Sequence, residues 1–174
     1  PSVKHRIQEW LDLQRKFPAS GVSGEYGFYI NACYPLQGDR RSFFARYLEQ
    51  AQPSSGYQLL ALMARAGTIS SVWTTNFDTL PARSAAAANI SVIEVGLDSQ
   101  ARVNRVPRLG EMLSVALHGD YRYDELKNES QEIKNQEQHL IDAMIGAFTR
   151  TPVIVCGYSG RDSAIMDALS RILA

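Results

Sequence analysis

The apolar positions in the first third of the chain repeat with the period of an α-helix. Apolar residues between positions 3 and 13 fall on one helical stripe: Val3, Ile7, Trp10, Leu11 and Leu13. Similar spacing, interrupted by prolines, predicts helices over residues 3–16, 39–50 and 56–65, with a shorter helix within residues 20–34. We therefore expect a small helical subdomain over residues 1–67.

From residue 68 to residue 174 the pattern changes, and short β-rich runs alternate with helical segments. Strands are predicted at residues 71–75, 90–95, 112–117 and 152–156, and helices at residues 78–88, 129–149 and 161–173. Strands that alternate with helices favour a parallel sheet covered by helices on both faces. The predicted fold class is therefore α/β.

The composition is that of a soluble globular protein. Eighteen basic residues balance eighteen acidic ones, which argues against a broad surface for DNA or RNA because such binding depends on neutralising phosphates. No apolar run approaches the roughly 20 residues of a membrane span. The chain opens on Pro1 without a methionine and reads like a piece of something longer.

The two cysteines, Cys33 and Cys156, lie far apart and form no CxxC pair, so we expect no structural zinc site. Cys156 sits inside an apolar run, and we expect a buried thiol there. Two unpaired thiols suit a reducing cytoplasm.

Three of the four predicted strands end in a polar turn. The turns read Thr74-Thr75-Asn76-Phe77-Asp78, His118-Gly119-Asp120 and Gly157-Tyr158-Ser159-Gly160-Arg161-Asp162. In an open parallel sheet, ligands bind beyond the carboxyl ends of the strands, and those ends lie on one edge. We therefore expect an amide, an imidazole and a Gly-Ser turn to meet there.

Each of these groups has a chemical use. His118 suits a general base near neutral pH. Asn76 can orient a hydroxyl or a water without adding charge. Gly157 and Gly160 let backbone approach a ligand closely, Ser159 adds a hydroxyl, and the amides of the following helix are candidates to hold a phosphate or ribose oxygen.

Structural roles stay open for the same residues. Asn76, Asp78 or Thr79 is a natural helix cap at a strand-to-helix turn. A single histidine after a strand is more often structural than catalytic. The Gly-Ser turn is one residue short of the nucleophile elbow of hydrolases and could simply end a strand. The functional interpretation depends on the three turns occurring together.

In this order and strand context, the turns resemble those of the prokaryotic sirtuin-like (SIR2-like) NAD-hydrolase domain family. The first resembles the Thr-Gln-Asn-Ile-Asp stretch of sirtuin deacetylases and, more closely, the Thr-Thr-Asn-Phe-Asp of the prokaryotic branch. Leu117-His118-Gly119-Asp120 resembles the sirtuin His-Gly signature. The Gly157–Asp162 turn is similar to the final-strand loop of the prokaryotic branch, where deacetylases carry Gly-Thr-Ser. The resemblance runs from about residue 70 to the end of the chain.

The resemblance implies a Rossmann-like domain that binds NAD and splits it into nicotinamide and ADP-ribose, without a metal. Asn76 and His118 would be the catalytic pair. The remaining site residues would contact the substrate: Thr75, Phe77 and Asp78 around the nicotinamide ribose, Ser159 on the adenosine side, and Gly157, Tyr158 and Asp162 beside it.

Many family members serve bacterial antiviral defence by abortive infection, fused to a sensor or oligomerising region. By the same resemblance we expect a cytoplasmic protein that works with other domains or a partner subunit and forms a homo-oligomer. We expect direct contact with neither nucleic acid nor membrane.

Two departures from the family pattern matter. Deacetylating sirtuins carry four zinc-binding cysteines after the His-Gly turn, whereas residues 119–149 contain none, which favours NAD hydrolysis over peptide deacetylation. The family also opens with a strand and a Gly-Ala-Gly-x-Ser loop that cradles the pyrophosphate, and no such run is present. That loop either precedes Pro1 or is missing, and in the second case we expect poor NAD affinity.

Two alternatives remain at this stage. The first is a non-catalytic module that senses NAD or ADP-ribose, or that mediates assembly. The second is a protein deacylase that works without zinc. The sequence does not distinguish a linear from a cyclic ADP-ribose product.

Overall fold

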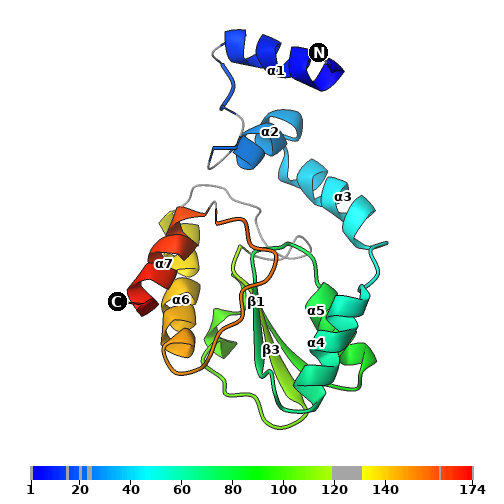
Figure 1. Cartoon of the computed structure of the whole chain (residues 1–174), viewed down its shortest axis with the longest axis vertical. Helices are drawn as coiled ribbons and strands as arrows, with labels where there is room; N and C mark the ends of the chain where they lie inside the picture. The colour runs from blue at the N-terminus through cyan, green and yellow to red at the C-terminus, as the bar shows by residue number, and fades with distance from the viewer. Residues whose placement is uncertain are drawn as a thin grey trace.

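The computed structural model describes residues 2–14, 16–19, 21–22, 25–118, 131–160 and 162–173 (Figure 1). Four helices precede a three-stranded parallel sheet with interleaved helices, which confirms the predicted α/β fold. The elements are α1 (Val3–Gln14), α2 (Glu25–Cys33), α3 (Gln37–Leu48), α4 (Ser55–Arg65), β1 (Ser71–Thr74), α5 (Leu80–Ala87), β2 (Ser91–Val95), the short 3₁₀ helix η1 (Gln100–Arg102), β3 (Glu111–Ala116), α6 (Gln131–Phe148) and α7 (Ser163–Leu173).

The sheet has the strand order β1-β3-β2, and both pairings are parallel. β3 is central, with Thr74 of β1 paired to Ala116 and Val95 of β2 paired to Val115. The ladder continues one residue past β3, because the Leu117 N–H donates to the Thr74 carbonyl at 2.9 Å. The carboxyl ends of β1 and β3 therefore lie side by side, as expected for neighbouring parallel strands.

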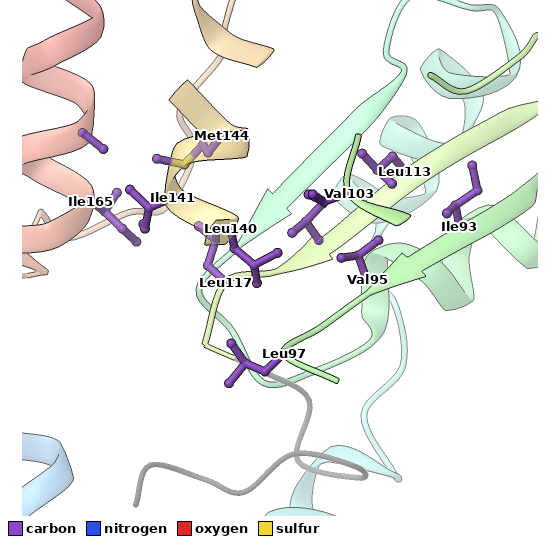
Figure 2. Close-up of a cluster of buried hydrophobic side chains, with 12 residues drawn as sticks. Ile93, Val95, Leu97, Val103, Leu113, Leu117, Leu140, Ile141, Met144 and Ile165 are labelled. Atoms are coloured by element: carbon purple, nitrogen blue, oxygen red, sulfur yellow. The ribbon is translucent and has the colours of Figure 1, made fainter. Parts of the chain in front are cut away.

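Alternating side chains give the sheet two apolar faces, and each is covered by helices. One face packs against α6 and α7 through a buried cluster that includes Val115, Leu140 and Met144 (Figure 2). The opposite face presents Met112, which is fully buried with Ala61 of α4 and Ala85 of α5. The expected two-sided cover is thus present, and it leaves the carboxyl edge of the sheet open for a site.

The predicted fourth strand, residues 152–156, is wrong. This segment forms no strand pairing, and its β-branched side chains are exposed, Ile154 to 77%. The residue types favour extended backbone, but a strand also requires a hydrogen-bonded neighbour and an apolar face to cover. Both edges of β3 are already paired, and residues 153–156 instead line a cavity beside β1.

The helical stripe predicted for α1 is present but is not buried. Val3, Ile7, Trp10 and Leu13 are all exposed, and α1 stands away from the sheet in Figure 1. Within the described residues, no helix is long and apolar enough to cross a membrane.

Candidate functional site

Asn76 and His118 follow neighbouring parallel strands at equivalent positions. Thr74 is paired with Ala116, and each candidate residue comes two positions later in its own chain segment. Adjacent strands lie about 4.8 Å apart, so the register brings the backbone of the two residues to one place on the carboxyl edge of the sheet. The two side chains then enter different surroundings.

Asn76 lines a cavity of about 270 Å³ between β1, α6 and the segment before α7. We call it the first cavity. None of its described lining residues carries a charged side chain. They are Tyr57, Trp73, Thr74, Thr75, Asn76, Leu117, Met144, Phe148, Val153, Ile154, Val155, Cys156, Gly157, Tyr158, Ile165 and Leu169. The lining combines hydroxyl and amide groups with aromatic and aliphatic surface, a mixture typical of sites for neutral organic groups.

His118 lies between two carboxylates rather than in the lining of the first cavity. Its Nε2 is 2.8 Å from Oδ2 of Asp162, and its Nδ1 is 3.7 Å from Oε1 of Glu137 on α6. The first distance is within hydrogen-bonding range, whereas the second is too long. His118 is largely buried, at 18% exposure, so Asp162 fixes its ring orientation. Leu117, the preceding residue, does line the first cavity.

Asp162 also organises the start of α7. Its Oδ1 accepts hydrogen bonds from the backbone N–H groups of Ala164 and Ile165, the geometry of a helix N-cap. Its carbonyl oxygen accepts a hydrogen bond from the Tyr158 hydroxyl at 3.3 Å. Two of the amides that the sequence offered for a phosphate are therefore already bound to Asp162. Asp162 thus contacts both His118 and the start of α7, and its assignment as a substrate contact stays a prediction.

The other residues of the Gly157–Asp162 turn divide between cavity and solvent. Gly157 and Gly160 have φ angles of +67° and +71°, which explains their identity because other residues adopt this region at a cost. Gly157 and Tyr158 line the first cavity with Thr75, whereas Ser159 is exposed outside the lining of that cavity. Gly119, Asp120, Arg161 and the predicted loop 121–128 lie outside the described residues.

Phe77 and Asp78 turn away from the first cavity. The Phe77 ring packs on Phe44 of α3 at a centroid distance of 5.4 Å. Asp78 Oδ1 accepts the Leu80 N–H at the start of α5, whereas Thr79, the N-cap residue, makes no side-chain cap hydrogen bond. Asp78 also lines a second cavity of about 330 Å³, and the charged side chains there include Glu94, Asp98 and Arg102.

Cys156 corrects another expectation, because its side chain is exposed. The apolar run that contains it does not pair into the sheet, so it does not bury the thiol. Within the described residues, no group of three or more His, Cys, Asp or Glu side chains gathers as a metal site would require.

Tyr57 and Glu137 were not predicted as site residues, because no motif marks either of them. Tyr57 comes from α4 and lines the first cavity together with Asn76. Burial and the Asp78 carboxylate raise the pKa of Tyr57, and the polar Asn76 amide opposes them. Burial and the Asp162 carboxylate likewise raise the pKa of Tyr158 above its ordinary value, against the hydrogen bond to the Asp162 backbone. Both phenols therefore keep their protons at neutral pH.

Comparisons with known proteins agree with this layout. A comparison with curated proteins returned no match. Residues 70–174 match the SIR2-like domain, a span that contains all three polar turns, all three strands, and helices α5, α6 and α7. This span is well over half of the chain, and the protein belongs to the SIR2-like domain family.

Proposed function

We propose that this protein is an NAD-consuming hydrolase that splits NAD into nicotinamide and ADP-ribose. The observation that carries the proposal is the register of β1 and β3, which brings Asn76 and His118 to the same point on the carboxyl edge of the sheet. Membership of the SIR2-like family supports NAD as the substrate. Asn76 and His118 are the proposed catalytic pair.

The first cavity fits one end of the substrate. Its volume of about 270 Å³ is near the lower limit of small-molecule pockets, which begin at about 300 Å³. It therefore suits the nicotinamide and its ribose, and the remainder of the dinucleotide must extend beyond it. The uncharged lining favours a carboxamide, an aromatic ring and ribose hydroxyls. Thr75 and Asn76 supply hydroxyl and amide groups, and Trp73 and Phe148 supply aromatic surface.

The reaction breaks the bond between the nicotinamide nitrogen and the anomeric carbon of the ribose. The electron pair of that bond leaves with nicotinamide, which becomes neutral, and positive charge develops on the ribose. Water adds to the anomeric carbon and loses a proton, so NAD⁺ and water yield nicotinamide, ADP-ribose and one proton. Asn76 orients the ribose hydroxyls and the attacking water, which lowers the entropic part of the barrier.

His118 receives the proton. In the neutral ring, Nε2–H donates to Asp162, which leaves Nδ1 as the acceptor. The 3.7 Å separation between Nδ1 and Glu137 leaves that nitrogen without a hydrogen bond to the carboxylate. A histidine whose tautomer is fixed by a carboxylate is the arrangement that general bases use in other hydrolases. Positioned base catalysis typically contributes about 10²–10⁴-fold to a rate.

We extend the proposal to the protein's setting. The family resemblance supports an effector part of a larger bacterial antiviral protein, in which residues 68–174 bind NAD and residues 1–67 form a helical subdomain. The exposed apolar stripe of α1 is consistent with contacts to other protein surface, since such stripes are usually covered.

The test measures nicotinamide release from NAD by chromatography, with the full chain that contains residues 1–174. Asn76→Ala and His118→Ala should each lower kcat at least about 100-fold while the thermal unfolding midpoint stays near that of the wild type. Asn31→Ala and His139→Ala are matched controls, because both side chains are exposed on helices and line neither cavity. Both controls should keep wild-type rates.

Three outcomes would contradict the proposal. Full activity in either site variant removes that residue from the reaction. NAD binding without nicotinamide release by the wild type identifies a sensor instead. Nicotinamide release that requires an added acyl-peptide identifies a deacylase.

A further inference from the structure

The strand β1 lies at one edge of the sheet, and its outer side has no strand beside it. Within the described residues, β1 pairs with β3 alone. The carbonyl oxygens of Ser70 and Thr74 accept hydrogen bonds from β3, and backbone groups alternate in direction along a strand. The N–H and C=O groups of Ser71 and Trp73 therefore point to the outer side, where no strand of the described chain meets them.

A second extended segment lies across the first cavity from this outer side. Residues 153–156 line the cavity together with Trp73 and Thr74 of β1. The segment leads to the turn whose Asp162 contacts His118, so it runs toward the carboxyl edge of the sheet in the same direction as β1 (Figure 1). It forms no strand pairing within the described residues, and the exposed fractions of its three β-branched side chains range from 40% to 77%.

The two unpaired backbones form the walls of a gap that we call the strand slot, between β1 and residues 153–156. Exposed β-branched side chains are unusual at this place in an α/β fold, because its parallel strands are normally buried on both faces. An edge strand can recruit an extended segment, because its free N–H and C=O groups bond to the new backbone. One added strand would supply partners to both walls of the slot.

The lining of the slot defines the side chains that such a strand can carry. No described residue that lines the first cavity has a charged side chain, so a charged occupant would lose its hydration without gaining a partner. Met144, Phe148 and Leu169 add apolar surface from α6 and α7. β1 has four residues, so a strand of similar length matches it. The slot is therefore complementary to a short, uncharged segment rich in Val, Ile and Thr.

We propose that the strand slot is a binding site for one further parallel strand, an uncharged segment rich in β-branched residues that is supplied by polypeptide outside residues 1–174. The added strand pairs with both walls and makes residues 153–156 part of the sheet. This inference goes beyond the proposed reaction. The strand lies along Trp73, whereas Asn76 and Tyr158, at the carboxyl end of the same cavity, stay available to the substrate.

The experiment adds the synthetic peptide acetyl-Thr-Val-Ile-Val-Thr-amide to the full chain of residues 1–174 and follows backbone amide exchange by ¹⁵N NMR. Without peptide, the Trp73 amide should exchange rapidly, because it has no strand partner. At saturating peptide, exchange at Trp73 and at one or more amides of residues 153–156 should slow at least about tenfold. The amide of Tyr29 should not change, since α2 does not line the slot.

Two controls separate strand pairing from simple hydrophobic contact. The same peptide with N-methyl groups on its two valines keeps every side chain but loses two backbone donors, so it should bind at least about tenfold more weakly. Val155→Lys places a charge in the slot and should also weaken peptide binding. Val106→Lys should not, because Val106 is 82% exposed and lines neither cavity. Both variants should stay folded, since both valines are exposed.

The readout does not depend on catalysis. Equal binding of the methylated peptide, equal binding by Val155→Lys, or an unprotected Trp73 amide at the highest soluble peptide concentration would overturn the inference. Nicotinamide release without peptide protection removes the strand site and leaves the proposed function standing. Peptide protection without nicotinamide release supports the strand site and removes only the proposed function.

Discussion

The ends of β1 and β3 are neighbours, yet they provide different surroundings. Beyond β1, Asn76 faces a cavity whose described lining carries no charge. Beyond β3, His118 lies between the carboxylates of Asp162 and Glu137. Two residues in equivalent register thus enter a neutral and an acidic environment.

The two strand ends therefore suit two separate tasks. A neutral, partly apolar cavity suits the positioning of hydroxyls and water, because no fixed charge competes for their hydrogen bonds. A carboxylate beside an imidazole suits proton transfer, because it fixes the ring and stabilises the imidazolium that forms. The proposed reaction needs both tasks at neighbouring points, and the following predictions alter the side chains at these two ends.

The largest effect is expected at the acidic end, from Asp162→Asn. The new amide keeps one oxygen for the helix cap, but its N–H₂ group faces Nε2 of His118, which is also a donor. The ring must then adopt the other tautomer or turn away. We expect kcat for nicotinamide release to fall about 100-fold, while the thermal midpoint changes little because Asn and Asp cap helices almost equally.

Asp162→Ala separates the two roles of this side chain. It should lose a similar factor in rate and, in addition, about 1 kcal/mol of unfolding free energy from the missing cap. Urea titrations of both variants supply the comparison. If Asp162→Asn retained wild-type kcat, the contact with His118 would have no part in proton transfer.

A smaller effect is expected from Glu137→Gln. Its Oε1 is buried without a hydrogen-bond partner and lies 3.7 Å from Nδ1. Because this distance exceeds hydrogen-bond range, the variant should keep at least about one third of the wild-type kcat. A loss as large as that of Asp162→Asn would assign Glu137 an equal share in holding the ring, and steady-state kinetics on the paired variants would reveal it.

The smallest effect concerns one tyrosine at each end, Tyr57 and Tyr158. Both have a raised pKa in the folded chain, whereas the unfolded chain ionises its tyrosines near pH 10.0. Their contribution to stability is complete below that pH and is lost as pH rises through the folded values. The urea midpoint should therefore fall above pH 10.0, and less steeply in the double Phe variant. Identical slopes in the two proteins would contradict the shifts.

Much of the carboxyl edge was predictable from the sequence, because parallel strands place their ends together whatever the side chains do. The polar turns after β1 and β3 were found in this way, and the strand ends that precede them, Thr74 and Ala116, are paired. The segment 152–156 was mispredicted for the complementary reason. Its residue types report a preference for extended backbone, but strand formation also depends on a neighbouring strand that no local pattern encodes.

The contacts between helices and strands were harder to predict from the sequence. Glu137 lies on α6 and meets His118 only through helix packing on the sheet. The position of Tyr57 could have been predicted, because a helix that precedes a strand and runs back along the sheet brings its first turn to the carboxyl edge. Asp162 was selected from its turn, but its direction toward His118 depends on how α7 docks, which local sequence does not determine.

The two oxygens of Asp162 have a consequence for how this position can vary. One oxygen secures the final helix and the other secures the imidazole, on a side chain with a single methylene. Asparagine can satisfy the helix alone, and alanine neither. Most substitutions at residue 162 should therefore lower the reaction rate, the stability or both, and Asp162→Asn offers an engineer an inactive variant that stays folded.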